Sequence, residues 1–333
     1  MIRFAWRQLR GQAAGAIGAL AVVAIVLALA GAHSGYDSGL RTGLGVLVVV
    51  APGAAGLFWG APLVAGELEA GTFRLAWTQS VIRTRWLVGR AGLPVLGSMA
   101  VAGALSLIVT WWAGPFDRAG GNLFGTFDQH GLVPVGYAAF AAALGVTAGL
   151  LLRRTLPAMA VTLVVFLAAR LAVAAWLRPV LLAPSHLALA LNPATTGYGS
   201  SVSGLGFFAV LVGAGPQSAL EPAPPDLPNA WITSVRIVNH AGRDLTRRVF
   251  RTDCPGRSQS APGPAGGHAH SHVPAAVQQA MHDCVTRVGA GYHELVTYQP
   301  AGHYWPVQWL ELATFLGTAV ILGGFCRWWI GRV

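Results

Sequence analysis

The sequence predicts an all-α membrane protein with six transmembrane helices and a small α+β outer domain between the fifth and sixth helices. Hydrophobic residues make up 54% of the 333 residues and charged residues only 10%, whereas soluble domains carry roughly 25% charged residues. Apolar stretches of about 20 residues, the length that crosses a bilayer as a helix, recur along the chain. Because a bilayer core offers no partner for unpaired backbone groups, these stretches must be helical.

The charged residues exclude several classes of function. All 22 basic residues are arginine, against 12 acidic residues, and the formal net charge is +10. A chain without lysine has no P-loop lysine, no Schiff-base lysine and no Ser-Lys dyad. In so apolar a chain, the basic excess favours arginines that flank membrane spans, so we expect no nucleic-acid partner.

The predicted elements follow in order from the N-terminus. Residues 1–12 place arginines on one helical face and apolar residues on another, which is typical of an interfacial amphipathic helix; the alternative is a basic flank of the first span. A cleaved signal peptide is disfavoured because the first apolar core is too long. The six spans are predicted at residues 13–32, 43–64, 91–113, 132–152, 156–177 and 309–329.

The short loops orient these spans. Arginines gather at both ends of the chain and in the loops after the second and fourth spans, and the other two short loops hold few. Cytoplasmic loops carry the arginine excess. Both termini and the loop 65–90 are therefore predicted to be cytoplasmic. We therefore assign residues 13–177 to the first five spans, and residues 308–333 to the sixth span and the C-terminus.

The long segment 178–307 is predicted to be an extracytoplasmic domain. Two stretches alternate like strands, 231–238 and 293–298, and 274–288 has the pattern of a helix. Cys254 and Cys284 fall on this side, where disulfides persist, and we expect them to pair. The His-rich insert near them is surrounded by Gly and Pro, which favour a flexible chain, so no metal site is predicted.

The loop 65–90 carries the most informative pattern. Glu67 and Glu69 stand where the second span ends, and Gly71 with Thr72 can end one helix and start another. Arginines follow, and this mixture of charges and aromatics predicts a short cytoplasmic helix after a turn. The alternative is a solvated loop with snorkelling arginines.

This pattern resembles the first cytoplasmic loop of ABC-2-type transporter permeases, and its sequence is similar to that of permeases from the actinobacterial branch of the family. The residues that carry the resemblance, and the ATPase-coupling role that it implies, are Glu67, Glu69, Gly71, Thr72, Leu75, Thr78, Gln79, Ser80 and Arg83.

The resemblance implies a non-catalytic permease subunit, usually of an exporter, in the plasma membrane of a bacterium. Two permease copies would work with two ABC ATPase subunits that dock on the loop. ATP and Mg²⁺ would bind the ATPase, and no cofactor is expected on this chain. The alternative is a membrane-anchored sensor or assembly protein with a ligand-binding outer domain.

Two further features concern the spans. Arg170 lies inside the fifth span, where a charge faces either protein or a water-filled path, so it is a candidate for the translocation path; the alternative is snorkelling to the headgroups. Small residues in the second and fifth spans either join two copies or pack within one chain. Asp128 and His130, in the loop after the third span, are expected to be solvated.

Overall fold

The computed structural model describes residues 18–27, 38–71, 83–118, 123–191, 227–246 and 286–332, together with a few shorter pieces. The chain divides into two compact units. The first, the bundle unit, comprises Met1–Leu182 and Gly302–Val333. The second, the sheet unit, is Ala183–Ala301.

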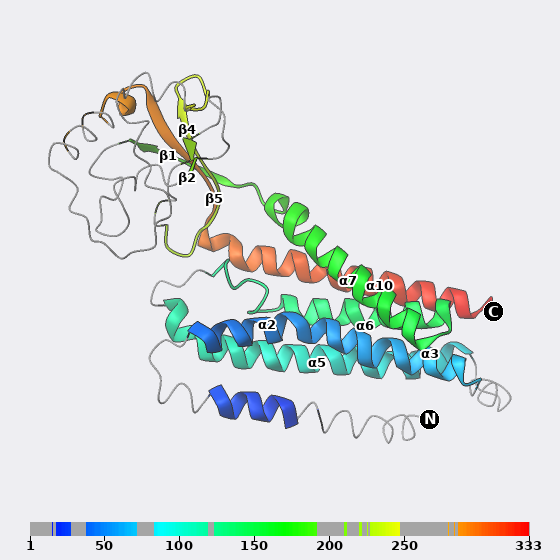
Figure 1. The fold of residues 1–333 in the computed structure, drawn as a ribbon. Coiled ribbons are helices and arrows are strands. Elements are labelled where there is room, and N and C mark those ends of the chain that lie inside the picture. Colours follow the sequence, from blue (N-terminus) through cyan, green and yellow to red (C-terminus); the bar gives the residue numbers. More distant parts are fainter. Residues whose placement is uncertain are drawn as a thin grey trace, which may run out of the picture. The chain divides into compact units, whose positions relative to one another are not determined.

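The bundle unit is built of long apolar helices (Figure 1). The second predicted span is continuous through α2 (Ser38–Ala55), a π-helical turn η1 (Gly56–Gly60) and α3 (Ala61–Glu69). The fifth is α7 (Thr155–Ala172), continued by the π turn η2 (Val173–Leu177) and the 3₁₀ turn η3 (Arg178–Val180). The others are α5 (Arg83–Arg118), α6 (Val133–Leu152) and α10 (Tyr304–Ile330), which begins after the 3₁₀ turn η4 (Ala301–His303).

Five helices in the described part of the chain are long and apolar enough to cross a membrane. They correspond to the second through sixth predicted spans. Of the first span the structure describes a ten-residue apolar helix, Gly18–Leu27, so the count of six stays a prediction. The amphipathic helix predicted at 1–12 lies outside the described residues.

Helix α6 occupies the centre of the bundle unit. It contacts the other four spanning helices, and most of its residues are buried. Every residue of α6 is apolar or small apart from Thr147 and Tyr137, which suits a helix surrounded by protein. By contrast, Leu156 and Leu171 on α7 are exposed, and so is Trp176 in its continuation. This exposure is expected of a helix that faces lipid on one side.

Backbone contact between α6 and the second span depends on glycine. A Cβ atom added at Gly145 would lie 2.5 Å from the carbonyl oxygen of Gly56, and one at Gly60 would lie 2.7 Å from the carbonyl oxygen of Ala142. Gly53 similarly faces the ring of Phe166 on α7. These second-span glycines therefore pack within one chain, which is the second of the two alternatives for the small residues. The exposed alanines of the fifth span stay available for a second copy.

The sheet unit contains an antiparallel three-stranded sheet in the order β1-β5-β4. Its strands are β1 (Ser185–Ala190), β5 (Tyr292–Gln299) and β4 (Trp231–Asn239). The two strands predicted from alternation are β4 and β5, while β1 was not predicted. A second pair joins β2 (Val210–Leu211) and β3 (Leu220–Glu221). Only fragments of the predicted helix 274–288 are described.

Glu294, in the middle strand, supplies a pH-dependent prediction. Glu294 is only 6% exposed, and its Oε1 atom has no hydrogen-bond partner among the described residues. Burial raises the pKa of this carboxyl, so ionisation opposes folding as the pH rises through the folded-state value. Glu294→Gln should therefore stabilise the sheet by up to about 1 kcal/mol at pH 7, and by less at pH 4. Slower amide hydrogen exchange in β4 and β5 would report it; equal exchange of both proteins at pH 7 would contradict it.

Candidate functional site: two polar sites at opposite ends of α6

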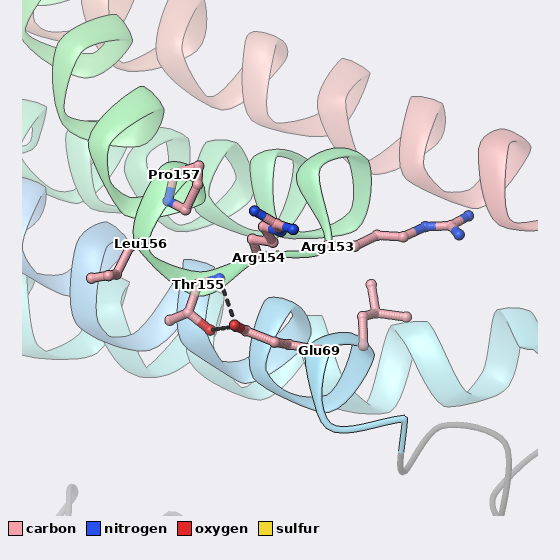
Figure 2. Close-up of a pocket in the computed structure, with 7 residues that line it drawn as sticks. Glu69, Arg153, Arg154, Thr155, Leu156 and Pro157 are labelled. Atoms are coloured by element: carbon pink, nitrogen blue, oxygen red, sulfur yellow. Dashed lines mark hydrogen bonds between the residues drawn. The ribbon is translucent and has the colours of Figure 1, made fainter.

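The first polar site joins the root of the loop 65–90 to the corner between α6 and α7. Glu69, the last residue of α3, accepts two hydrogen bonds at Oε2, from the backbone N–H of Thr155 at 2.9 Å and from its hydroxyl at 2.7 Å (Figure 2). Thr155 begins α7, so the carboxylate satisfies an unpaired N–H at the positive end of a helix. The loop root is thereby tied to the corner of the bundle.

Local backbone geometry sets up this site. Gly71, in the turn after α3, has φ +71°, and its N–H donates to the carbonyl of Leu68 at 3.3 Å. Arg153 at φ 53° ends α6 and the extended Arg154 leads directly into α7. Glu69, Arg153, Arg154 and Thr155 line a pocket of about 710 Å³, together with Leu68, Leu156 and Pro157 (Figure 2).

The remaining predicted coupling residues are placed only in part. Glu67 lies on α3, half-buried, and the backbone of Arg83 begins α5. The predicted positions Thr72, Leu75, Thr78, Gln79 and Ser80 lie outside the described residues, as do Cys254 and Cys284. Their coupling role and the disulfide stay predictions.

The second polar site is a charged cluster at the other end of α6. Arg178, in η3, makes a two-pronged ion pair with Glu311 of α10: Nε donates to Oε2 and Nη2 to Oε1, each at 3.0 Å. Glu311 is fully buried. Nη2 of Arg178 also donates to Oδ1 of Asp128. The hydroxyl oxygen of Tyr137 on α6 lies 2.6 Å from Oε1 of Glu311 and 2.8 Å from Oδ1 of Asp128, and its single proton can be donated to either carboxylate.

Arg170 borders this cluster on the side of α2. Its Nη1 donates to the carbonyl oxygen of Val49 at 2.7 Å, and its Nη2 lies 3.7 Å from Oδ2 of Asp128. Its guanidinium carbon lies 4.6 Å from the centre of the Tyr137 ring. Arg170 is 9% exposed, so it faces protein and does not snorkel. Whether it borders a translocation path stays a prediction.

A glutamine fixes the loop that carries Asp128. Gln308 of α10 is fully buried, and its Nε2 donates to the carbonyls of Phe127 and His130, both at 3.1 Å. Its Oε1 accepts the N–H groups of Leu132 and Val133, both at 3.0 Å. These N–H groups begin α6 and have no partner within the helix. One side chain therefore joins the loop, α6 and α10.

Asp128 and His130 were expected to be solvated, and that expectation is wrong. The Asp128 side chain is 29% exposed and His130 is 4% exposed. Burial alone raises the pKa of the Asp128 carboxyl, but the charge and hydrogen bond of Arg178 outweigh it, so the pKa lies below its usual range. Asp128 thus stays ionised as the partner of both arginines.

The π turn η2 aligns the two arginines. In an unbroken α-helix, residues eight apart differ by roughly 80° around the axis, but a π turn absorbs one extra residue and reduces this difference to roughly 20°. Arg170 and Arg178 lie on either side of η2, so both can reach Asp128.

Single-residue deletions test this alignment. Deleting Ala174 inside η2 should restore a regular α-helix, keep Arg178 in the cluster and leave the thermal stability nearly unchanged. Deleting Ala168 in α7 should rotate Arg170 away from Asp128 and Tyr137 and cost about 3 kcal/mol. Thermal unfolding of the two deletion proteins measures the difference. Equal destabilisation by both deletions would rule out the proposed role of the π turn.

Sequence reasoning missed Arg178, Tyr137 and Glu311. Arg178 was assigned to the outer segment, because it follows the fifth span directly. A usable signal was Glu311, a carboxylate inside the sixth predicted span, where ionisable residues usually have a partner and a function.

Comparison with known proteins bears on the part of the chain that holds most of these residues. A family model described as "ABC-2 membrane transporter related" matches residues 26–178. No curated protein and no solved structure matches the chain. The matched segment runs from the first predicted span to Arg178 and includes the loop 65–90. Residues 26–178 of this multi-pass membrane protein are therefore an ABC-2 membrane transporter related domain.

Proposed function

We propose that the chain is the permease subunit of an ATP-driven ABC transporter, working as an exporter. A separate ABC ATPase would dock on the loop 65–90 and bind ATP and Mg²⁺. Two copies of each subunit would assemble in the plasma membrane of a bacterium, with both permease termini in the cytoplasm. The observation that carries this proposal is the match to an ABC-2 related domain over residues 26–178.

The absence of lysine supports a separate ATPase. Hydrolysis by a P-loop enzyme needs a lysine on the phosphates, and this sequence contains none. ABC-2 permeases are generally the non-catalytic membrane component of their transporters. In the proposed mechanism, closure of the ATPase dimer pushes the coupling loops, and the spans rearrange between inward and outward access.

The bond from Glu69 to Thr155 supports this mechanism because it links the loop root to the bundle. Force on the loop would pass from α3 to the start of α7 and to the end of the central helix α6. Both hydrogen bonds are exposed to solvent, which weakens them, but they are a direct contact between the loop root and the bundle.

Weakening this bond should uncouple the ATPase. Glu69→Gln and Thr155→Val should each lower substrate-stimulated ATP hydrolysis of the reconstituted complex by roughly two- to fivefold, while the complex still assembles. Thr314→Val is a matched control, because the Thr314 hydroxyl bonds only the Leu310 carbonyl of its own helix among the described residues. Equal activity of all three variants would show that this bond does not transmit the coupling.

The docking of an ATPase is tested separately. A photo-crosslinker at Gln79 should capture a polypeptide with a P-loop lysine, identified by mass spectrometry, whereas one at Gln129, in the loop at the opposite end of α6, should not. ATP hydrolysis by the purified chain alone would contradict the proposal. Capture of a histidine kinase at Gln79 would favour the sensor alternative instead.

A further inference from the structure

The charged cluster has two sides with opposite charge. One side is the end of the fifth span, and it contributes only positive groups, Arg170 and Arg178. The other side contributes the carboxylates of Asp128 and Glu311 and the rings of Tyr137 and Phe127. The guanidinium carbon of Arg178 lies 4.3 Å from the centre of the Phe127 ring. We call these four residues, Asp128, Glu311, Tyr137 and Phe127, the acceptor face.

The acceptor face is held together without help from the fifth span. Gln308 joins α10, the loop and the start of α6 through four hydrogen bonds to backbone groups. The ring of Tyr304 packs edge-on against Phe127 with centroids 5.5 Å apart. Tyr137 packs edge-on against Phe315 at 4.8 Å. The carboxylates and rings of the acceptor face are therefore positioned by residues of α6, α10 and the loop between α5 and α6.

The segment that supplies Arg178 is attached far more weakly. Of residues 173–180, all of which the structure describes, only Arg178 is buried. Trp176 and Val180 are 77% and 71% exposed. Apolar packing thus contributes little to holding this segment on the bundle, and the ion pairs of one arginine provide most of the attachment. The π turn η2 precedes Arg178 and is a natural place for such a segment to bend.

We propose that the acceptor face is a binding site for an organic cation, and that Arg178 occupies it in this structure. Two carboxylates beside two aromatic faces recognise guanidinium and ammonium groups, as the contacts of Arg178 and Arg170 already illustrate. A ligand would enter beside the Asp128 carboxylate, whose side chain is 29% exposed. Binding displaces Arg178 and replaces its positive charge, so the buried Glu311 keeps a counter-ion throughout. No bond forms or breaks.

The chemistry favours an amphiphilic organic cation over a metal ion. Aromatic rings stabilise a cation through their faces but do not coordinate a hard metal ion, which prefers oxygen ligands all round. The exposed apolar side chains of the fifth span lie next to Arg178 in the sequence and suit an alkyl or aryl tail. That this ligand is also the transported cargo rests on the proposed function, whereas binding itself does not.

Octylguanidine is the probe, because its head group copies that of Arg178, and octylurea is the uncharged control of the same shape. Binding is measured by isothermal titration of the purified full chain in phosphatidylcholine nanodiscs, with no ATPase present. Arg178→Gln should bind octylguanidine about tenfold more tightly than the wild type, or better, because it vacates the site. Adding Asp128→Asn or Glu311→Gln should abolish that gain, and octylurea should gain nothing.

Arg236→Gln is the matched control variant. Arg236 pairs with Asp244 in the sheet unit, and both side chains are substantially exposed, so its loss should leave octylguanidine affinity unchanged. The proposal is overturned if Arg178→Gln and the wild type bind octylguanidine equally, or if octylurea binds the variant as tightly as octylguanidine does.

A second variant covers poor folding of Arg178→Gln. Arg170→Gln keeps the Arg178–Glu311 pair and releases the Tyr137 ring and one Asp128 oxygen. It should still gain affinity for octylguanidine, and no gain would overturn the proposal. Because the ATPase is absent, loss of binding and loss of ATPase coupling are separate results: the first rejects this site, and the second rejects the proposed function.

Discussion

Replacing Glu311 with leucine is expected to lower the free energy of unfolding of the bundle unit by about 3–5 kcal/mol, because the buried Arg178 loses its two-pronged partner. Arg178 is only 8% exposed, so little water is available to replace the lost carboxylate. Unfolding in detergent micelles, followed by tryptophan fluorescence, measures the change. Arg236→Gln breaks an exposed pair of the same type and should cost no more than about 1 kcal/mol.

A double variant separates the ion pair from the packing around it. Arg178→Met with Glu311→Leu removes both charges, leaves no buried ion without a partner and should recover most of the stability lost by Glu311→Leu alone. Asp128 and Tyr137 then keep their mutual hydrogen bond. If the double variant is as unstable as the single one, the shape of the two side chains matters more than their charge.

The sequence predicted the spanning helices well because membrane spans depend on one strong signal. A run of about 20 apolar residues has few alternatives in a bilayer, so α6 and α7 begin within one residue of the predicted spans. The end of α3 at Glu69 and the positive φ of Gly71 also follow from local chemistry. These are properties of neighbouring residues, which a sequence displays directly.

The charged cluster could not be assembled in the same way. Asp128, Tyr137, Arg178 and Glu311 come from four separate segments, and nothing in the local sequence of any one of them indicates the others. The register of Arg178 depends in addition on the π turn η2, which no hydropathy pattern reveals. Asp128 looked like an ordinary loop carboxylate, because the loop that carries it is held in place by Gln308, a residue 180 positions away. Long-range pairs of this kind need the fold.

The glycines of the second span show the same limit of prediction from sequence. Small residues predict a close helix contact but do not identify the partner helix. In the structure the partner of Gly56 and Gly60 is α6. A Cβ at Gly145 would meet backbone atoms, the Gly56 carbonyl oxygen at 2.5 Å and the Ala61 nitrogen at 2.8 Å. Backbone atoms of two packed helices cannot turn aside as a flexible side chain does.

Gly145→Ala should therefore destabilise the bundle unit by about 2–3 kcal/mol, although it adds one methyl group to a helix and improves helix propensity. Gly317→Ala is the matched control, because it adds the same methyl group to α10 with nothing within 4 Å among the described residues. The control should be neutral or stabilise by up to about 1 kcal/mol. Unfolding of both variants in the same micelles measures the contrast. Equal stability would mean that α6 and the second span do not cross in backbone contact, and a second copy would again be the better explanation of these glycines.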